Sequence, residues 1–401
     1  MKITHIHIER FRGFQNEDFE VGSLLTAIAG QNGTQKSTLL GIITQTFTLK
    51  TEDSMRVEKP LCGGSYISAF KDKFRLSPTF DKPKGHEWTI SFDAGMDDFT
   101  VESIKRTGDP NVRFWKKGAR QEGDGYISFP TIFLSLKRLV PVAEEAKIIT
   151  DDTLLTQEEL NEFKQLHNKI LIAQTPISSA TTITSKNKQS IGVSTELYDW
   201  NQNSMGQDNL GKIILALFSF KRLHDKYPRQ YKGGILAIDE MDATMYPASQ
   251  VELLKVLRKY ASKLNLQILF TTHSMSLLKA MDDLVQEVTK KEETANQAKI
   301  LYLKKVDDKI AIKQGVNFKG IQLDLNVVAE GNNRKKNRIT AYTEDKENIL
   351  FVKAILKSKA FVLDFVDVTL PCSTLMELVT KRVPAFIYPY SIVILDGDVR
   401  M

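Results

Sequence analysis

A glycine-containing loop between a short apolar run and a helical pattern constrains this chain most. Residues 24–29 are apolar, as in a buried strand, and residues 38–47 have the spacing of a helix. The loop between them reads Gly30-Gln-Asn-Gly-Thr-Gln-Lys-Ser-Thr38. Strand, loop and helix in this order let backbone amides wrap phosphate groups at a helix N-terminus. The sequence therefore predicts a phosphate-binding loop rather than a chance run of Gly and Lys.

The residues of this loop suit a nucleotide bound with Mg²⁺. Lys36 is expected to reach the β- and γ-phosphates, and the Ser37 hydroxyl to hold the metal ion. Gln35 stands where such loops usually carry glycine, and its Cβ costs about 1 kcal/mol if φ is positive. Binding is expected to survive because the backbone amides remain. The nucleotide-binding residues we predict are Gly30, Asn32, Gly33, Thr34, Gln35, Lys36, Ser37 and Thr38.

A second apolar strand ends in two acids. Residues 235–238 are apolar, and Asp239 and Glu240 follow directly. Phosphoryl transfer needs positioning and charge neutralisation, so we expect Asp239 to organise the Mg²⁺ shell and Glu240 to polarise the attacking water. Alone, such an ending is equally typical of a surface turn. Together with the loop at 30–38 it favours an ATPase site.

Two further motifs follow the same order. Ser204 and Gly206 precede a helical pattern that starts near Asn209, and His273 follows an apolar strand at 266–271. Ser204 suits a helix N-terminus that faces a phosphate, although an ordinary serine cap is the simpler alternative. A lone histidine is usually a satisfied polar residue, but its position after Glu240 favours a functional role.

In this order the motifs resemble those of ABC-type and SMC-type ATPases over residues 1–315. The resemblance implies ATP, Mg²⁺ and a homodimer with two nucleotides at the subunit interface. Ser204 and Gly206 would contact the nucleotide of the other subunit, and His273 the γ-phosphate. Asp242 matches the loop along the dimer interface. Arg12 is similar to an arginine near the nucleotide or DNA, with a plain turn arginine as the alternative.

The segment Asp239-Glu-Met-Asp-Ala-Thr-Met-Tyr-Pro247 resembles the OLD family, with Tyr246 where that family has His. Further on, residues 342–347 and 392–398 look like parts of a Toprim domain. Glu344, Asp396 and Asp398 match its Mg²⁺ ligands, and hard oxygen ligands suit that ion. The chain ends at Met401, so we expect this domain to be incomplete.

The alternation of helices and apolar strands predicts an α/β fold with a mixed or parallel sheet. We expect an ATPase head over 1–335, with a helical dimerisation insert at about 144–200, and a Toprim-like α/β segment over 336–401. Within the insert, residues 156–173 have helical spacing with a capping box, whereas the polar stretch 178–190 predicts a loop.

The charge and composition of the chain indicate its location and partners less specifically than the motifs indicate its chemistry. A formal charge of +6 permits contact with DNA without requiring it. The two cysteines lie far apart, which fits a reducing compartment. No signal peptide or run of about 20 apolar residues is present, so we expect a soluble cytoplasmic protein.

These resemblances imply an effector of bacterial anti-phage defence. The first hypothesis is an OLD-like, ATP-regulated DNA endonuclease. The second is a regulatory ATPase with an inert Toprim segment that controls a partner. Septu-like systems would supply an HNH nuclease, and retron systems a reverse transcriptase with its RNA–DNA product; Gabija is a further related system. DNA repair of the SMC kind is disfavoured by the short insert.

Overall fold

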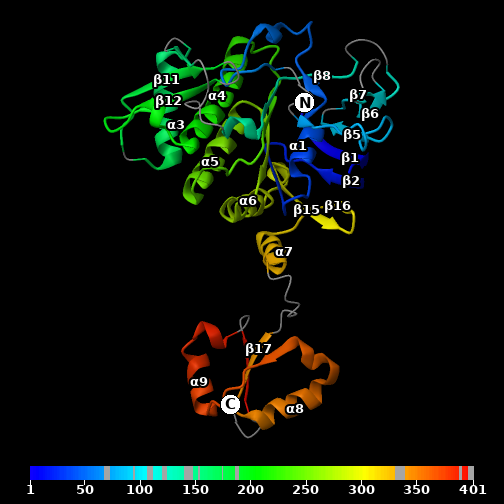
Figure 1. Ribbon diagram of the computed structural model, residues 1–401, viewed down its shortest axis with the longest axis vertical. Helices are drawn as coiled ribbons and strands as arrows, with labels where there is room; N and C mark the ends of the chain where they lie inside the picture. Colours follow the sequence, from blue (N-terminus) through cyan, green and yellow to red (C-terminus); the bar gives the residue numbers. More distant parts are fainter. Residues whose placement is uncertain are drawn as a thin grey trace. The chain divides into compact units, whose positions relative to one another are not determined.

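The computed structural model describes residues 1–66, 73–93, 95–105, 112–119, 124–139, 148–151, 154–173, 175–185, 189–329, 339–387 and 391–395. The chain divides into two compact units, Met1–Leu325 and Asn326–Met401 (Figure 1). The boundary expected at 335 therefore lies inside the second unit.

A six-stranded sheet forms the centre of the first unit, with the order β16-β15-β3-β14-β13-β9. Its neighbours pair in parallel except for β15 with β16, which confirms the mixed, largely parallel α/β sheet. The strands are β3 (Leu25–Gly30), β9 (Thr131–Leu134), β13 (Gly234–Ile238), β14 (Leu266–Thr272), β15 (Ala298–Val306) and β16 (Lys309–Lys313). The carboxyl ends of β3, β13 and β14 thus share one edge, where the predicted motifs follow.

Helices cover both faces of this sheet because side chains alternate along each strand (Figure 1). Ile28 and Leu269 join one core with α1 (Lys36–Thr44), and Ala27 and Ile268 join the opposite core. The second core includes α4 (Met205–Lys226), α5 (Pro247–Lys263) and α6 (Met275–Val288). The helix α7 (Phe318–Ala329) adds Ile321 to this core, and two short helices, η2 (Leu136–Leu139) and η5 (Glu292–Thr294), lie elsewhere in the first unit. Within the described ranges, no helix is both long and apolar enough to cross a membrane.

An antiparallel sheet packs on the other side of α1 (Figure 1). Its order is β2-β1-β5-β6-β7. The strands are β1 (Ile3–Phe11), β2 (Phe14–Glu20), β5 (Glu87–Phe92), β6 (Phe99–Lys105) and β7 (Val112–Lys116). Nearby lie the small pair β4 (Phe47–Thr48) and β8 (Ile127–Ser128) and the turn η1 (Ser54–Val57).

The insert differs from the helical segment expected at 144–200. Its helix α3 (Gln157–Leu171) has the predicted capping box between Thr156 and Glu159. Beside α3, however, a three-stranded sheet is formed by β10 (Ile149–Asp151), β11 (Ser179–Thr184) and β12 (Gln189–Ser194), followed by η4 (Trp200–Gln202). The loop predicted over 178–190 was wrong, because the β-branched residues Thr181, Thr182 and Ile183 favour a strand.

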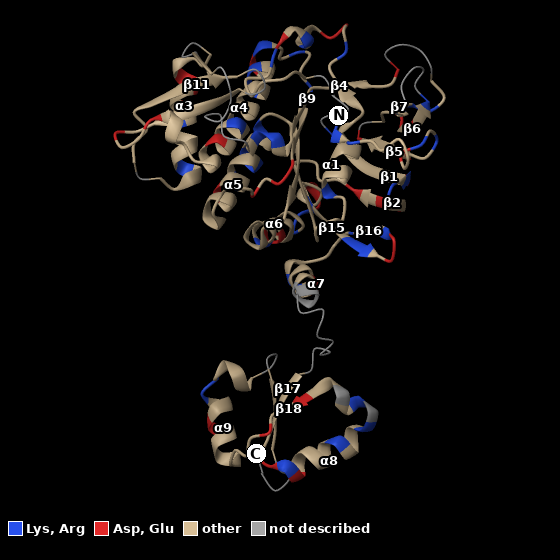
Figure 2. Ribbon diagram, in the orientation of Figure 1, with Lys and Arg blue, Asp and Glu red and all other residues tan. Residues whose placement is uncertain are grey.

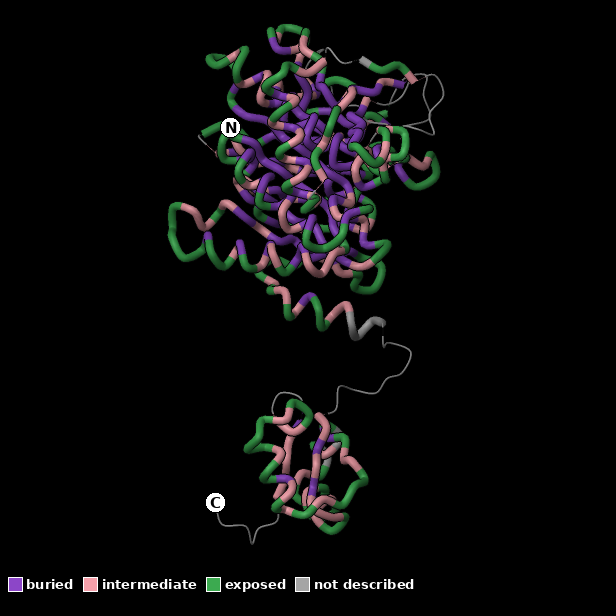
Figure 3. The backbone as a smooth tube through the Cα atoms, turned by 90° about the vertical axis from the view of Figure 1, so that its left-hand side faces the viewer, coloured by how far each residue is buried: buried purple, intermediate pink, exposed green. Residues whose placement is uncertain are grey.

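The second unit has a small parallel sheet with the order β18-β17-β19. Its elements are β17 (Ile339–Thr343), α8 (Lys346–Leu356), η6 (Lys357–Val362), β18 (Leu363–Phe365), α9 (Cys372–Thr380), η7 (Pro384–Phe386) and β19 (Ser391–Ile394). Few of its residues are buried (Figure 3). Charges of both signs lie along α8, while Leu350, Phe351 and Ile355 remain exposed (Figure 2). An α/β segment is therefore present where one was expected.

Candidate nucleotide site

The loop between β3 and α1 has a backbone that depends on residues with positive φ. Gly30 has φ 152°, and a Cβ there would lie 2.4 Å from the Leu303 carbonyl oxygen, so only glycine fits. Gly33 has φ 79°, with open space on its side-chain side. Gln35 is left-handed at φ 62°, which is the condition under which its Cβ was expected to cost free energy. The loop leads into α1, whose first turn carries no acid, so the helix N-terminus suits an anion.

Lys36 turns its amine back into the loop. The Nζ atom donates to the carbonyl oxygens of Gly30 at 3.0 Å and Gln31 at 2.9 Å. Burial lowers the pKa of Lys36 to about 8, although the carboxylates of Glu240 and Asp239 oppose this shift. The amine is therefore held where phosphate oxygens would replace the two carbonyls.

Ser37 and Asp239 meet as the sequence predicts. The Ser37 hydroxyl donates to Asp239 Oδ1 at 2.8 Å, and the Thr271 hydroxyl donates to the same oxygen at 2.7 Å. Thr271 also accepts from the Glu240 amide at 2.6 Å. Hydroxyl and carboxylate oxygens side by side are ligands that Mg²⁺ prefers. This cluster joins the ends of β13 and β14 to the start of α1.

Glu240 begins a tight turn after β13. It has φ 50°, a left-handed conformation uncommon outside glycine, and its carbonyl accepts from the Ala243 amide at 3.1 Å. Arg138 Nη2 donates to the same carbonyl at 2.7 Å. Arg138 and Thr271 were not singled out from the sequence, because an arginine between a lysine and a leucine and a threonine in a strand have no distinctive pattern.

Ser204 is the N-cap of α4. Its hydroxyl accepts a hydrogen bond from the Gln207 backbone amide at 3.4 Å. The Ser204 backbone amide in turn donates to the Gln207 side-chain oxygen, which completes a capping box. Gly206 lies so close to the turn after Glu240 that a Cβ would meet the Thr244 carbonyl oxygen at 2.6 Å. The predicted signature residues therefore pack against the Glu240 turn of their own chain.

His273 follows β14 and is exposed. Its backbone amide donates a hydrogen bond to Asp242 Oδ1 at 3.4 Å. Loss of water around the imidazole and the nearby Lys36 ammonium lower the pKa of His273. Next to it, Ser274 caps α6 and donates to Gln250, whose amide donates to the Asp242 carbonyl at 3.2 Å. His273 and Asp242 are thus brought together beside Lys36.

Arg12 does not point freely toward a ligand. Its guanidinium donates to both oxygens of Asp81 at 3.0 Å, and His86 contacts the same buried carboxylate at 3.1 Å. Burial raises the pKa of Asp81, but the bonds from Arg12 and the Ser77 amide outweigh this and lower it. This pairing supports the simpler interpretation of Arg12 as a structural turn residue, and contact with nucleotide or DNA stays a prediction.

The acidic residues predicted to bind metal in the second unit are only partly described. Glu344 follows β17 and is half-buried, and its carbonyl accepts from the Leu370 amide at 3.2 Å. β19 runs parallel to β17 with Ile394 opposite Thr343, so both strands end at one edge of the sheet. Asp396 and Asp398 lie outside the described residues, and their metal site stays a prediction.

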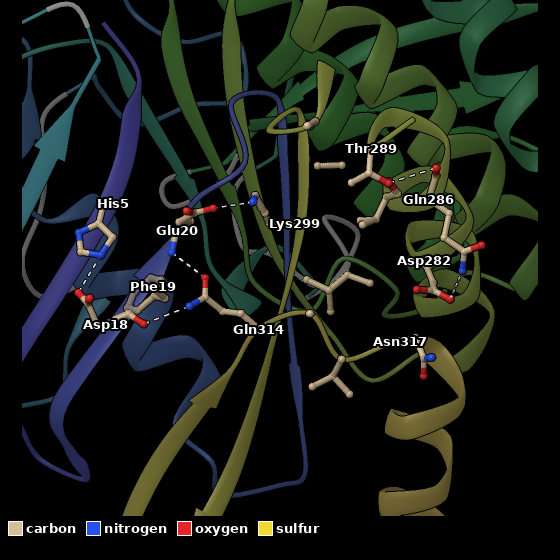
Figure 4. A pocket seen from close by; sticks show the side chains of 16 residues that line it. His5, Asp18, Phe19, Glu20, Asp282, Gln286, Thr289, Lys299, Gln314 and Asn317 are labelled. Carbon is tan, nitrogen blue, oxygen red and sulfur yellow. Dashed lines mark hydrogen bonds and ion pairs between the residues drawn. The ribbon is translucent and has the colours of Figure 1, made fainter. Parts of the chain in front are cut away.

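A separate hollow of about 810 Å³ lies between β2, α6 and β15 (Figure 4). Two of its carboxylates form ion pairs, Glu20 with Lys299 at 2.6 Å and Asp18 with His5 at 2.7 Å, and the third, Asp282, accepts a hydrogen bond from Gln286 at 2.9 Å. No residue of the loop 30–38 lines it. The hollow is therefore distinct from the candidate nucleotide site.

The region that contains the acids, the signature residues and His273 matches a known domain. Residues 136–278 match the family model of the AAA ATPase domain. This chain therefore carries an ATPase domain. The matched region does not include the loop 30–38, whose assignment stands on its own geometry. No curated protein sequence matches the chain.

Solved structures of SMC heads are similar to about four-fifths of the chain. The SMC head domain from Thermotoga maritima aligns at 14% identity and TM-score 0.43, covering 79% of this chain and 100% of that one. An Smc head bound to the C-winged helix domain of ScpA aligns at 13% and 0.47, covering 80% and 100%. An Smc head with an extended coiled coil, bound to the C-terminal domain of ScpA derived from Pyrococcus furiosus, aligns at 13% and 0.44, covering 82% and 99%.

Proposed function

We propose that this chain binds Mg²⁺-ATP at residues 30–38 and hydrolyses it. The contact between Ser37, Asp239 and Thr271 carries the proposal, because it gathers metal-binding oxygens from three elements next to a buried lysine. Lys36 would hold the β- and γ-phosphates, Ser37 and Asp239 the metal ion, and Glu240 the attacking water. His273 would contact the γ-phosphate. Mg²⁺ would neutralise charge on the phosphate oxygens.

The active form in this proposal is a homodimer. The capped N-terminus of α4 carries Ser204 and Gly206, and a helix N-terminus attracts an anion. We infer that it faces the nucleotide of a second copy, as it does in the ABC-type and SMC-type ATPases that the sequence resembles. Two ATP molecules would then hold the two first units together.

Substitution of Glu240 tests the hydrolytic role. Glu240→Gln keeps the size of the side chain but removes the base, so we expect hydrolysis to fall by about 10²-fold or more with ATP binding retained. Phosphate release and equilibrium binding of a fluorescent ATP analogue measure the two effects. Glu252→Gln, at a partly exposed position where the carboxylate pairs with Lys255, is the control. Hydrolysis by Glu240→Gln at the wild-type rate would contradict the assignment.

The downstream activity proposed is ATP-regulated DNA cleavage by the second unit, in bacterial anti-phage defence. It is supported by the parallel arrangement of β17 and β19, which end at one edge, and by the acids that follow them in the sequence. Plasmid DNA with Mg²⁺, with and without ATP, provides the test. Wild-type cleavage that is lost in an Asp396→Ala/Asp398→Ala variant is the expected result.

Gln35 favours a second candidate, a regulatory ATPase that controls a partner nuclease or a reverse transcriptase with its RNA–DNA product. Its left-handed backbone at φ 62° carries a side chain where a phosphate loop normally has none. A strained loop suits slow turnover and a long-lived ATP state. If the wild type binds ATP but leaves plasmid intact, this candidate replaces the nuclease.

A further inference from the structure

Arg138 is a buried arginine beside the Glu240 turn. It lies in η2, directly after β9, and its side chain is 2% exposed. Among the described residues, Arg138 donates its hydrogen bonds only to neutral oxygens. These are Asn209 Oδ1 at 2.6 Å and the carbonyl oxygens of Glu240 at 2.7 Å, Ser135 at 3.1 Å and Leu134 at 3.2 Å. A buried charge costs much free energy unless several bonds compensate it, so this geometry is maintained at a cost.

The carbonyl that Arg138 contacts belongs to a strained residue. Glu240 is left-handed at φ 50°, and such a conformation persists when surrounding contacts fix it. Its carbonyl accepts from Arg138 Nη2 at 2.7 Å and from the Ala243 amide at 3.1 Å. Its amide donates to Thr271 at 2.6 Å. Both backbone polar groups of Glu240, its N–H and its C=O, are therefore held by hydrogen bonds, and these bonds fix the position from which its side chain starts.

Asn209 ties this arginine to helix α4. Asn209 is fully buried, its Oδ1 accepts from Arg138 Nε at 2.6 Å, and its Nδ2 donates to the Ala243 carbonyl at 2.9 Å. Both ends of one amide thus link α4 to the arginine and to the turn. Because Ser204 and Gly206 lie at the N-terminus of the same helix, a shift of that helix moves Asn209 and the turn together.

We propose that Arg138 and Asn209 are positioning residues, which fix the Glu240 peptide and couple it to α4. Neither needs to touch the nucleotide. The coupling makes hydrolysis at Glu240 depend on the position of α4, and hence on the ligand that its N-terminus meets. This inference rests on the proposed function for the role of Glu240 in hydrolysis, but the hydrogen bonds that fix the turn do not depend on it.

The first test follows the turn itself by hydrogen–deuterium exchange of the full-length protein without nucleotide. Arg138→Lys keeps the charge but cannot bridge Asn209 and Glu240, and Asn209→Leu removes both amide bonds. We expect amides of residues 241–245 to exchange about tenfold faster in either variant. Arg222→Lys is the matched control. It makes the same substitution as Arg138→Lys, and Arg222 lies on α4 like Asn209, but its guanidinium pairs with Glu159 instead of the Glu240 turn. Wild-type exchange in both bridge variants would overturn the proposal.

The second test measures ATP hydrolysis and binding. Each bridge variant should lower kcat about tenfold or more, with KM and the Kd for ATP changed by less than about twofold. The double variant should be no slower than the single ones, because the two residues act as one unit. A faster-exchanging turn with unchanged kcat, or an equal loss in Arg222→Lys, would overturn the positioning role. If the wild type binds ATP without hydrolysing it, the proposed function fails while the exchange data still decide whether the bridge holds the turn.

Discussion

At the scale of single residues, the candidate site contains three left-handed residues that are not glycine. Gln35, Glu240 and Thr244 have φ of 62°, 50° and 68°. Each such residue costs of order 1 kcal/mol, and positions of this kind cluster at functional sites. The stored strain is compensated by the packing of the two cores on either side of the sheet.

The strain at Gln35 can be isolated by two substitutions. Gln35→Gly and Gln35→Ala both remove the amide, but only alanine keeps a Cβ at φ 62°. We expect the glycine variant to have a free energy of unfolding about 1 kcal/mol higher than the alanine variant. Denaturant unfolding followed by tryptophan fluorescence reports on the first unit, because Trp88, Trp115 and Trp200 all lie there. An alanine variant as stable as the glycine variant would contradict the strain.

Lys36 gives nucleotide binding a pH dependence. Burial holds its pKa at about 8, below its ordinary value, so most of these amines are neutral at pH 9 when no nucleotide is bound. Phosphate groups raise the pKa again, and ATP binding at pH 9 should take up close to one proton per site, roughly none at pH 7. Calorimetry in buffers of different ionisation enthalpy measures the uptake. Lys36→Arg, which stays charged, should show none at either pH; equal uptake in both proteins would place the proton elsewhere.

The same group affects stability in a defined window. Because the pKa of Lys36 is lower in the folded chain than in the unfolded chain, the unfolded chain binds more protons between about pH 8 and 10.5. The contribution of this residue to stability therefore rises with pH across that window. A comparison of wild type with Lys36→Met by denaturant unfolding should show the wild type gaining relative stability from pH 8 to pH 10.

At the scale of elements, two helices begin with the same capping box, and only one of them is proposed to face a nucleotide. Thr156 and Ser204 each form a capping box, at α3 and α4 respectively. Loss of such a cap costs about 1 kcal/mol. The helices therefore provide a matched pair, in which the structural and the ligand-binding role of a cap can be separated.

Alanine substitution of the two caps should have the same effect on stability but not on assembly. We expect Thr156→Ala and Ser204→Ala each to lower the free energy of unfolding by about 1 kcal/mol. Only Ser204→Ala should weaken the ATP-dependent dimer, because only α4 is proposed to face a second nucleotide. Sedimentation of the hydrolysis-deficient Glu240→Gln background with ATP measures the dimer. Equal weakening by both substitutions would reduce Ser204 to a plain cap.

The elements near the site could be predicted from the sequence, but the strands of the insert could not. β13 spans the predicted residues because a short, continuous apolar run that ends at Asp239 and Glu240 is typical of a buried strand. The strands β11 and β12 were missed because Ser and Thr are equally typical of loops, and only pairing across the hairpin decides. Arg138 and Asn209 were missed for a related reason. Their roles depend on a contact between residues 71 positions apart, which no local pattern records.

At the scale of the whole molecule, the described nucleotide-site residues belong to one unit. The loop 30–38, Asp239, Glu240 and His273 all lie within Met1–Leu325. The second unit has its own small sheet and few buried residues. A unit with its own core can in principle fold alone.

A chain that ends after α7, at Ala329, should therefore keep the nucleotide site. We expect its Kd for ATP to match that of the full chain within about twofold, and its tryptophan-detected unfolding to be unchanged within about 1 kcal/mol. DNA cleavage, if present in the full chain, should disappear. Loss of ATP binding on truncation would mean that the second unit contributes to the site.

The bonds from Lys36 to the carbonyls of Gly30 and Gln31 have a consequence for turnover. In the proposed cycle, these two carbonyl oxygens would surround the amine once ADP and phosphate had left. Each new nucleotide would then exchange one set of oxygens around the Lys36 amine for another. The affinity for ATP would depend on the difference between these two sets of contacts, and the strand-to-helix turn would not need to refold between cycles.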